Sequence, residues 1–173
     1  MGMFDDDYEE ADEPVGDDSA PDALTLLRDD HARVSDLFDA YEAAVSGAHD
    51  DRKPALAQKI CALLGVHAQL EEEIFYPAVR DAIEEQNLVD EAEVEHASAK
   101  DLIEQIEAMG PGDALYDAKV KVLGEYVKHH IREEEDELFP AVELSELDLQ
   151  DLGTDLQERK KELEEELGLE FAS

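Results

Sequence analysis

Apolar residues recur at alternating intervals of three and four along four long segments of the chain. This spacing lines one face of an α-helix with apolar side chains, and each such face must be covered by another. Stretches containing glycine or proline, at 47–51 and 110–112, interrupt the pattern. The pattern predicts an all-α protein built as a four-helix bundle. The helical segments span about residues 22–46, 54–78, 89–109 and 113–142.

The two halves of the chain repeat one another around histidine. The second segment reads HAQLEEEIFYP over residues 67–77, and the fourth reads HIREEEDELFP over residues 130–140. Both place glutamates four and five residues after the histidine and a proline ten residues after it. The first and third segments carry Asp-His-Ala at 30–32 and Glu-His-Ala at 95–97. A duplicated helical hairpin predicts an up-down-up-down bundle with a pseudo-twofold axis.

The net charge of the chain limits which binding partners are expected. The chain has 49 Asp and Glu against 14 Lys and Arg, a formal net charge of −35. A surface this negative repels phosphate backbones and anionic lipids, so neither nucleic acid nor a membrane is an expected partner. The acid excess has three interpretations, which are solvated helix faces with an acidic tail, adaptation to high salt, and cation binding.

Three parts are expected along the chain. Residues 1–21 form an acidic disordered tail, residues 22–142 the bundle, and residues 143–173 a tail with a short amphipathic helix. That helix either packs across the bundle or joins two chains in a homodimer, and it carries no evident chemistry. The sequence has no membrane-spanning apolar run and no secretory signal, and its lone cysteine, Cys61, fits a reducing compartment. A cytoplasmic location is therefore expected.

Four of the six histidines lie on the apolar stripes, one per segment. Glutamates four residues later place His67 beside Glu71 and His130 beside Glu134 on one helical face. A buried carboxylate without a partner is strongly destabilising, and no lysine or arginine lies on these stripes. A metal ion would supply the missing charge. The candidate ligands are His31, His67, Glu71, His96, His130 and Glu134.

The donor types constrain the metal. No thiolate takes part, so a structural tetrahedral zinc site is not expected. Imidazole with carboxylate suits iron, with manganese and zinc as alternatives. Six donors are too many for one metal with an open position, and they suit two metals bridged by two glutamates. Ferritin-like proteins place Glu before His, in Glu-x-x-His, so the order found here argues against that fold.

At these positions the sequence resembles the hemerythrin-like, HHE cation-binding family. The His and His-x-x-x-Glu spacings, the FYP and LFP endings and the His doublet at 129–130 carry the resemblance over residues 22–142. The resemblance implies a non-haem centre of two iron ions bridged by an oxo or hydroxo group. The implied ligands are His31 and His67 for one iron, His96 and His130 for the other, and Glu71 and Glu134 as bridges.

One departure from the family bears on function. Oxygen-carrying hemerythrins use a fifth histidine one turn along the third helix, but Ala92 and Lys100 stand four residues before and after His96. This argues against stable oxygen carriage. We expect a protein that binds or senses O2, peroxide or nitric oxide. The alternatives are an enzyme that removes peroxide or nitric oxide, and an iron store or structural metal bundle. Binding or sensing is favoured because no general acid or base is evident beside the ligands.

Other residues near the candidate ligands have more than one interpretation. Glu72 and Glu135 are hydrogen-bond partners of the ligands, alternative ligands or solvated side chains. Tyr126 is expected on the inward side of its helix, as a core residue or as a partner of a group bound to the metal. His129 is expected at a helix boundary, and His49 in a solvated turn. Packing around the site is expected of Phe38, Phe75 and Phe139.

Overall fold

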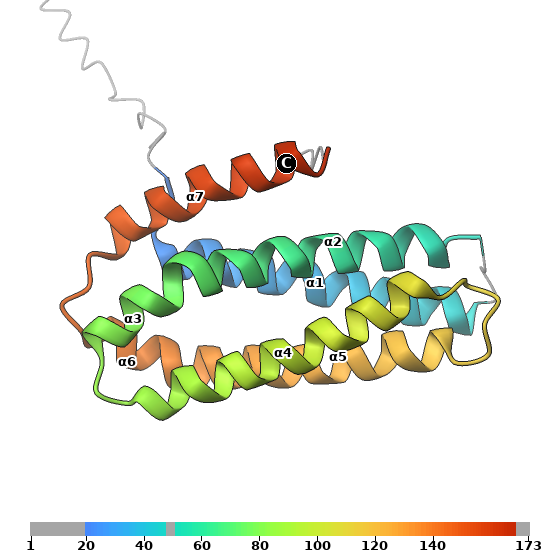
Figure 1. Ribbon diagram of the computed structural model, residues 1–173, viewed down its shortest axis with the longest axis horizontal. Coiled ribbons are helices and arrows are strands. Elements are labelled where there is room, and N and C mark those ends of the chain that lie inside the picture. The colour runs from blue at the N-terminus through green and yellow to red at the C-terminus, as the bar shows by residue number, and fades with distance from the viewer. Residues whose placement is uncertain (1–19, 48–50, 169–173) are drawn as a thin grey trace, which may run out of the picture.

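The computed structural model describes residues 20–47 and 51–168, and these residues form helices joined by short loops (Figure 1). Most of the acidic tail, and His49, lie outside the described residues. None of the described helices is long and apolar enough to cross a membrane. The helices are α1 (Ala23–Ser46), α2 (Lys53–Leu70), α3 (Tyr76–Ala82), α4 (Gln86–Ala108), α5 (Tyr116–Glu133), α6 (Phe139–Glu143) and α7 (Leu149–Glu166), with η1 (Glu71–Phe75) and η2 (Glu134–Leu138) as π-helical turns.

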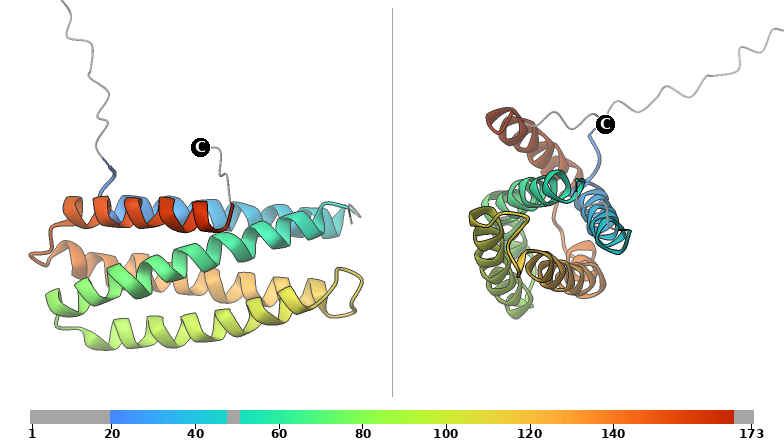
Figure 2. Two further views of the ribbon diagram at one scale, coloured as in Figure 1. Left: turned by 45° about the horizontal axis from the view of Figure 1, so that its top comes forward. Right: turned by 90° about the vertical axis from the view of Figure 1, so that its right-hand side faces the viewer.

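Helices α1, α2, α4 and α5 run antiparallel around a common centre, as the view along their axes shows (Figure 2). The predicted all-α, up-down-up-down bundle is confirmed. Local sequence explains several helix ends. The Asp22 carboxylate accepts a hydrogen bond from the Thr25 backbone N–H (3.0 Å), which caps α1. Pro54 lies in the first turn of α2, where its missing N–H costs nothing. Gly168 follows α7 with a φ of 64°.

Each half of the bundle contains one π-helical turn, and a proline explains it. Pro77 and Pro140 lack an N–H and crowd the carbonyl four residues earlier, which breaks the α-helical ladder. The residue before each proline instead donates to the carbonyl five residues back, as Tyr76 does to Glu71. The expected break at Pro77 is thus confirmed, although it begins six residues before the proline.

The π turn changes which side chains face inward. It holds an extra residue, so side chains five apart come close to one face. After Glu71 the buried residues are Phe75, Tyr76 and Val79. Ile74 and Ala78, which regular α-helical spacing would point inward, are therefore only partly buried, although they pack against the apolar core.

Two apolar clusters fill the bundle, with a polar layer between them. One includes Leu27 and Leu70, and the other includes Val34 and Ile60. Along α1, His31 lies between Leu27 of the first cluster and Val34 of the second. The polar layer therefore has apolar residues beyond both of its ends.

Helix α7 lies outside the four-helix bundle against α1 and α2 (Figure 2). Leu152, Leu156 and Leu163 are buried there, whereas Leu167, which follows Leu163 at helical spacing, is 58 % exposed. Gly153 permits the close approach, because a Cβ at this position would overlap the backbone just before α1. The packing interpretation of this helix is confirmed, and a homodimer formed through it stays a prediction.

Candidate metal centre

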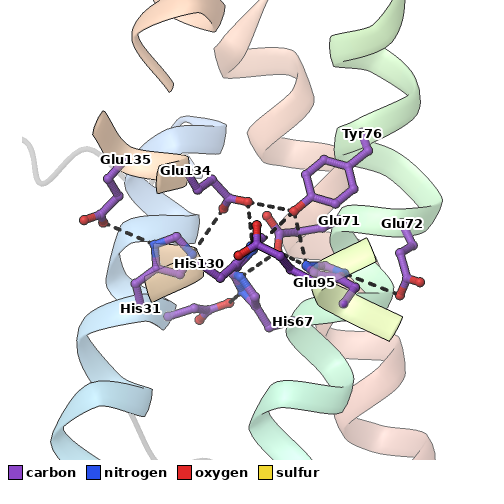
Figure 3. A network of polar contacts seen from close by, with 11 residues as sticks. His31, His67, Glu71, Glu72, Tyr76, Glu95, His130, Glu134 and Glu135 are labelled. Carbon is purple, nitrogen blue, oxygen red and sulfur yellow. Dashed lines mark hydrogen bonds and ion pairs between the residues drawn. The ribbon is translucent and has the colours of Figure 1, made fainter. Parts of the chain in front are cut away.

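Six side chains from α1, α2, α4, α5 and the two π turns meet in the polar layer (Figure 3). They are the six candidates predicted from the sequence. Each long helix contributes one histidine, and each π turn contributes its first residue, Glu71 or Glu134. The two glutamates are 0 % and 2 % exposed. The structure therefore brings together His31, His67, Glu71, His96, His130 and Glu134.

Each glutamate spans the two halves of the repeat. Glu71 Oε1 lies 2.9 Å from Nε2 of His67 and 3.3 Å from Nε2 of His96. Glu134 makes the same kind of contacts, with Oε2 3.2 Å from Nε2 of His130 on α5 and Oε1 3.3 Å from Nε2 of His31 on α1. The pseudo-twofold relation predicted from the sequence thus holds in the arrangement of these contacts.

Many of the atoms that point into this layer have no hydrogen bond. Among the described residues, both carboxylate oxygens of Glu71 and Nε2 of His31 and His67 are buried without a hydrogen bond of good geometry, although His67 and His96 face Glu71 at ion-pair distance. An unsatisfied buried polar atom costs about 1–3 kcal/mol, and more when it is charged. The donors suit two cations that share carboxylates. Within the layer, two groups have ligand atoms that all lie within 4.8 Å of one another, and they are His31, His67, Glu71 and Glu134, and Glu71, His96 and His130.

The outer nitrogens of the histidines, the Nδ1 atoms that point away from the centre of the layer, also face carboxylates. Nδ1 of His67 donates to Asp30 (3.1 Å), and Nδ1 of His130 donates to Glu95 (3.3 Å). A proton held on Nδ1 directs the Nε2 lone pair toward the centre of the layer, the arrangement that metal-binding histidines use. Asp30 and Glu95 were not predicted as site residues. Each directly precedes a stripe histidine, so the repeated acid-His pair was the available signal.

Glu135 and Glu72 complete this outer set. Nδ1 of His31 donates to Glu135 (3.2 Å), while Glu72 lies 3.8 Å from Nδ1 of His96 and pairs with Lys100. Both glutamates are about one-third exposed at the side chain and face the outer nitrogens. This geometry favours the interpretation as outer partners over that as ligands.

Burial and charge shift the pKa values of this network. Burial lowers the pKa values of His67 and His130, but their carboxylate partners outweigh burial and raise them to about 10 and about 11. Burial raises the pKa of Glu71, but the facing imidazoles hold it well below its ordinary value. Protons on the imidazoles therefore balance the buried carboxylates when no metal does. A metal and a proton compete for the same nitrogens.

Tyr76 is a site residue that the sequence analysis missed. It is 1 % exposed, and its hydroxyl donates to Glu134 Oε2 (2.7 Å) and lies 3.2 Å from Nε2 of His96. Burial and the neighbouring glutamates raise its pKa well above the ordinary value, so the phenol keeps its proton. On a regular helix Tyr76 would not share a face with Glu71, five residues earlier. The π turn brings the two together.

Two expectations about neighbouring residues are corrected. Tyr126 is 53 % exposed and lies outside the core, because Val127 takes the inward position. The His129 side chain is 57 % exposed and pairs with Glu133 (3.0 Å). Neither residue joins the polar layer.

The layer is not fully symmetric. Phe139 occupies the place in the second half that Tyr76 occupies in the first. Its ring stacks on the His31 imidazole, with centroids 5.9 Å apart and an interplanar angle of 8°. The hydroxyl therefore lies beside the second-half histidines, and an apolar ring covers a first-half histidine.

Helix α7 adds a second asymmetry. Lys160 Nζ lies 2.5 Å from one oxygen of Asp30, whose other oxygen accepts from His67. Burial raises the pKa of Asp30, but His67 and Lys160 together keep it below its ordinary value. The counterpart in the second half, Glu95, groups with His129 and Glu133 instead. The helix expected to carry no chemistry thus supplies a charge to one half of the layer.

Comparison with known proteins agrees with this site. The sequence model of the hemerythrin HHE cation binding domain matches residues 22–142. The chain belongs to this family. The structure of an HHE cation binding domain-containing protein from Mycobacterium kansasii shares the hemerythrin fold, with a TM-score of 0.72 and 20 % identity. The match covers 84 % of this chain and 89 % of that one.

A curated protein from Nostoc sp. (strain PCC 7120), named DNA nickase, is 32 % identical over 149 residues. The match covers 83 % of this chain but 40 % of the relative, so the chain spans less than half of that protein. The hemerythrin family and the cation-binding character expected from the sequence are confirmed, and the His and Glu groups are where a cation could bind.

Proposed function

We propose that this hemerythrin-family chain holds two iron ions in the polar layer and uses them to bind or sense O2 or a related small species, peroxide or nitric oxide. The observation that carries the proposal is the convergence of four imidazoles on two buried, shared carboxylates whose inward atoms lack hydrogen bonds. His31 and His67 would hold one ion, His96 and His130 the other. When bound, iron supplies the redox chemistry that these small species require, and manganese or zinc would fit the same donors.

The surroundings support a metal site whose ligands are held in fixed orientations. Apolar clusters lie on both sides of the layer, and outer carboxylates fix the imidazole orientations. Cys61 is a buried free thiol, which supports the proposed cytoplasmic location. DNA cleavage, suggested by the name of the Nostoc relative, is not proposed, because a net charge of −35 disfavours contact with phosphates.

The second candidate function is enzymatic removal of peroxide or nitric oxide, and Tyr76 favours it. Binding was favoured over catalysis because no general acid or base was evident beside the ligands. Tyr76 holds a proton at its hydroxyl 3.2 Å from Nε2 of His96. It can therefore donate a hydrogen bond within the layer.

Stopped-flow mixing of the reduced, iron-loaded protein with O2 and with hydrogen peroxide separates the candidates. A lasting spectral change without turnover supports binding or sensing, and repeated peroxide consumption supports the enzyme. Tyr76→Phe should slow consumption if the phenol takes part, whereas Tyr126→Phe, at an exposed tyrosine, should not. Iron that responds to none of these reagents would contradict both and leave a storage or structural role.

A further inference from the structure

A large cavity adjoins the histidine side of the polar layer. Its volume is about 370 Å³, and all four bundle helices line it. The imidazoles of the four candidate ligands form part of its wall, whereas the bridging glutamates and Tyr76 do not line it. On the glutamate side the layer is covered by Phe75 and Phe139, both 0 % exposed. The wide space next to the proposed metals therefore lies on the histidine side.

The rest of the cavity wall is mainly apolar. It includes Leu63, Ile103 and Val127, and two exposed apolar side chains, Val94 (68 %) and Tyr126 (53 %), also line it. Water in such a space finds few hydrogen-bond partners. Exposed apolar groups beside a cavity, on a chain with a net charge of −35, point to an apolar occupant.

Gly65 keeps one side of this cavity free of side chains. It lies within α2 and lines the cavity, and a Cβ built on it would meet no atom within 4 Å. Neither close packing nor a left-handed backbone conformation requires glycine here, although glycine weakens a helix relative to alanine. Its effect in the structure is to leave room for an occupant.

We propose that this cavity binds a neutral, mainly apolar organic molecule with one end against the imidazoles of the metal layer. A cavity of about 150 Å³ accepts benzene, so 370 Å³ accepts a molecule about twice that size, much larger than O2. An anion is disfavoured because the chain is strongly acidic, Glu95 lines the cavity, and the Lys100 ammonium is already paired with Glu72. The proposal deepens the proposed function by naming a class of substrate or effector, and only the identity of its metal neighbour rests on that function.

The test uses the neutral fluorophore N-phenyl-1-naphthylamine with the full chain, both metal-loaded and treated with a chelator. We expect a saturable fluorescence increase with one site per chain in both forms. Gly65→Phe fills the cavity and should weaken binding by about tenfold or more, whereas Gly65→Ala should bind as the wild type does. 1-Decanol should displace the probe, and decanoate, which has a similar chain but a negative charge, should not.

A second pair of variants protects the test against misfolding of Gly65→Phe, which circular dichroism would reveal. Val94→Asp, at the cavity, should weaken binding, and Val122→Asp, an exposed valine that does not line it, should not. Any of three results would overturn the proposal. They are the absence of saturable probe binding, binding by Gly65→Phe and Val94→Asp equal to that of the wild type, and displacement by decanoate as readily as by decanol. Probe binding by a folded chain that takes up no iron when iron is supplied would leave this proposal standing and refute the proposed function.

Discussion

Metal uptake should displace protons from the buried layer. Without a metal, the pKa of His67 is raised to about 10 and that of His130 to about 11, so both imidazoles are protonated near pH 8. A metal requires the free lone pair of the nitrogen, so each of these two histidines must release its proton. We expect about two protons to be released per chain. Each released proton makes the overall affinity rise about tenfold per pH unit, which is about a hundredfold between pH 7 and pH 8 for the pair.

Calorimetric titration of the chelator-treated protein with Zn²⁺, which undergoes no redox change, gives both quantities. Repeating the titration in buffers of different ionisation enthalpy counts the protons. The rise of metal affinity with pH should level off as the pH approaches about 10, because there His67 loses its proton without a metal. Asp30→Asn removes a group that raises the pKa of His67, so in this variant the rise should level off at a lower pH.

Asp117→Asn is the matched control, because Asp117 lies in the first turn of α5, far along that helix from His130 in its last turn. It should leave proton release and its pH dependence unchanged. Tight metal uptake that releases no protons near pH 8, with an affinity that does not vary with pH, would refute the reasoning. It would mean that protonated imidazoles do not balance the buried carboxylates.

Three substitutions test other parts of the account. Tyr76→Phe removes a buried hydrogen bond to the Glu134 carboxylate (2.7 Å) and should lower the free energy of unfolding by about 1.5–3 kcal/mol. Urea denaturation measures this change, and an unchanged free energy would contradict the hydrogen bond. Lys160→Met should weaken metal binding by about tenfold, the low end of the range for residues that hold a ligand from outside. Arg159→Met, which breaks a surface ion pair with Glu73, should leave metal binding unchanged. Equal effects of the two substitutions would exclude a specific role for Lys160. Gly153→Ala should destabilise the fold by about 1–3 kcal/mol, because its Cβ would overlap backbone atoms that cannot yield, and a rise in the thermal midpoint would show that α7 does not pack there.

The sequence predicted the bundle because its information is local and repeated. Apolar residues at helical spacing fix four stripes, and the repeat fixes their antiparallel order. The six candidate ligands could be found because each lies on a stripe, where a histidine or glutamate stands out among apolar neighbours. Glu71 and Glu134 were identifiable for a further reason, since each lies one regular helical turn after a histidine and is the first residue of its π turn.

The residues that were missed lie where regular helical spacing fails, or where the contact is made with a residue of another helix. Tyr76 follows the π turn, so its direction depends on a proline-induced change of helical geometry. Asp30 and Glu95 lie beside the stripe, and their partners come from neighbouring helices, which sequence spacing does not reveal. Lys160 reaches Asp30 only because α7 folds back onto α1 and α2. Tyr126 was misplaced because Val127, the next residue, takes the inward position in that turn of α5.

Crystals of the iron-loaded protein, measured on either side of the iron absorption edge, would locate the proposed pair of metals. We expect two anomalous peaks per chain, one beside His31 and His67 and the other beside His96 and His130. Glu71 should lie between the peaks. A single peak, a peak elsewhere on the acidic surface, or a well-folded chain with no peak in the polar layer would contradict the account.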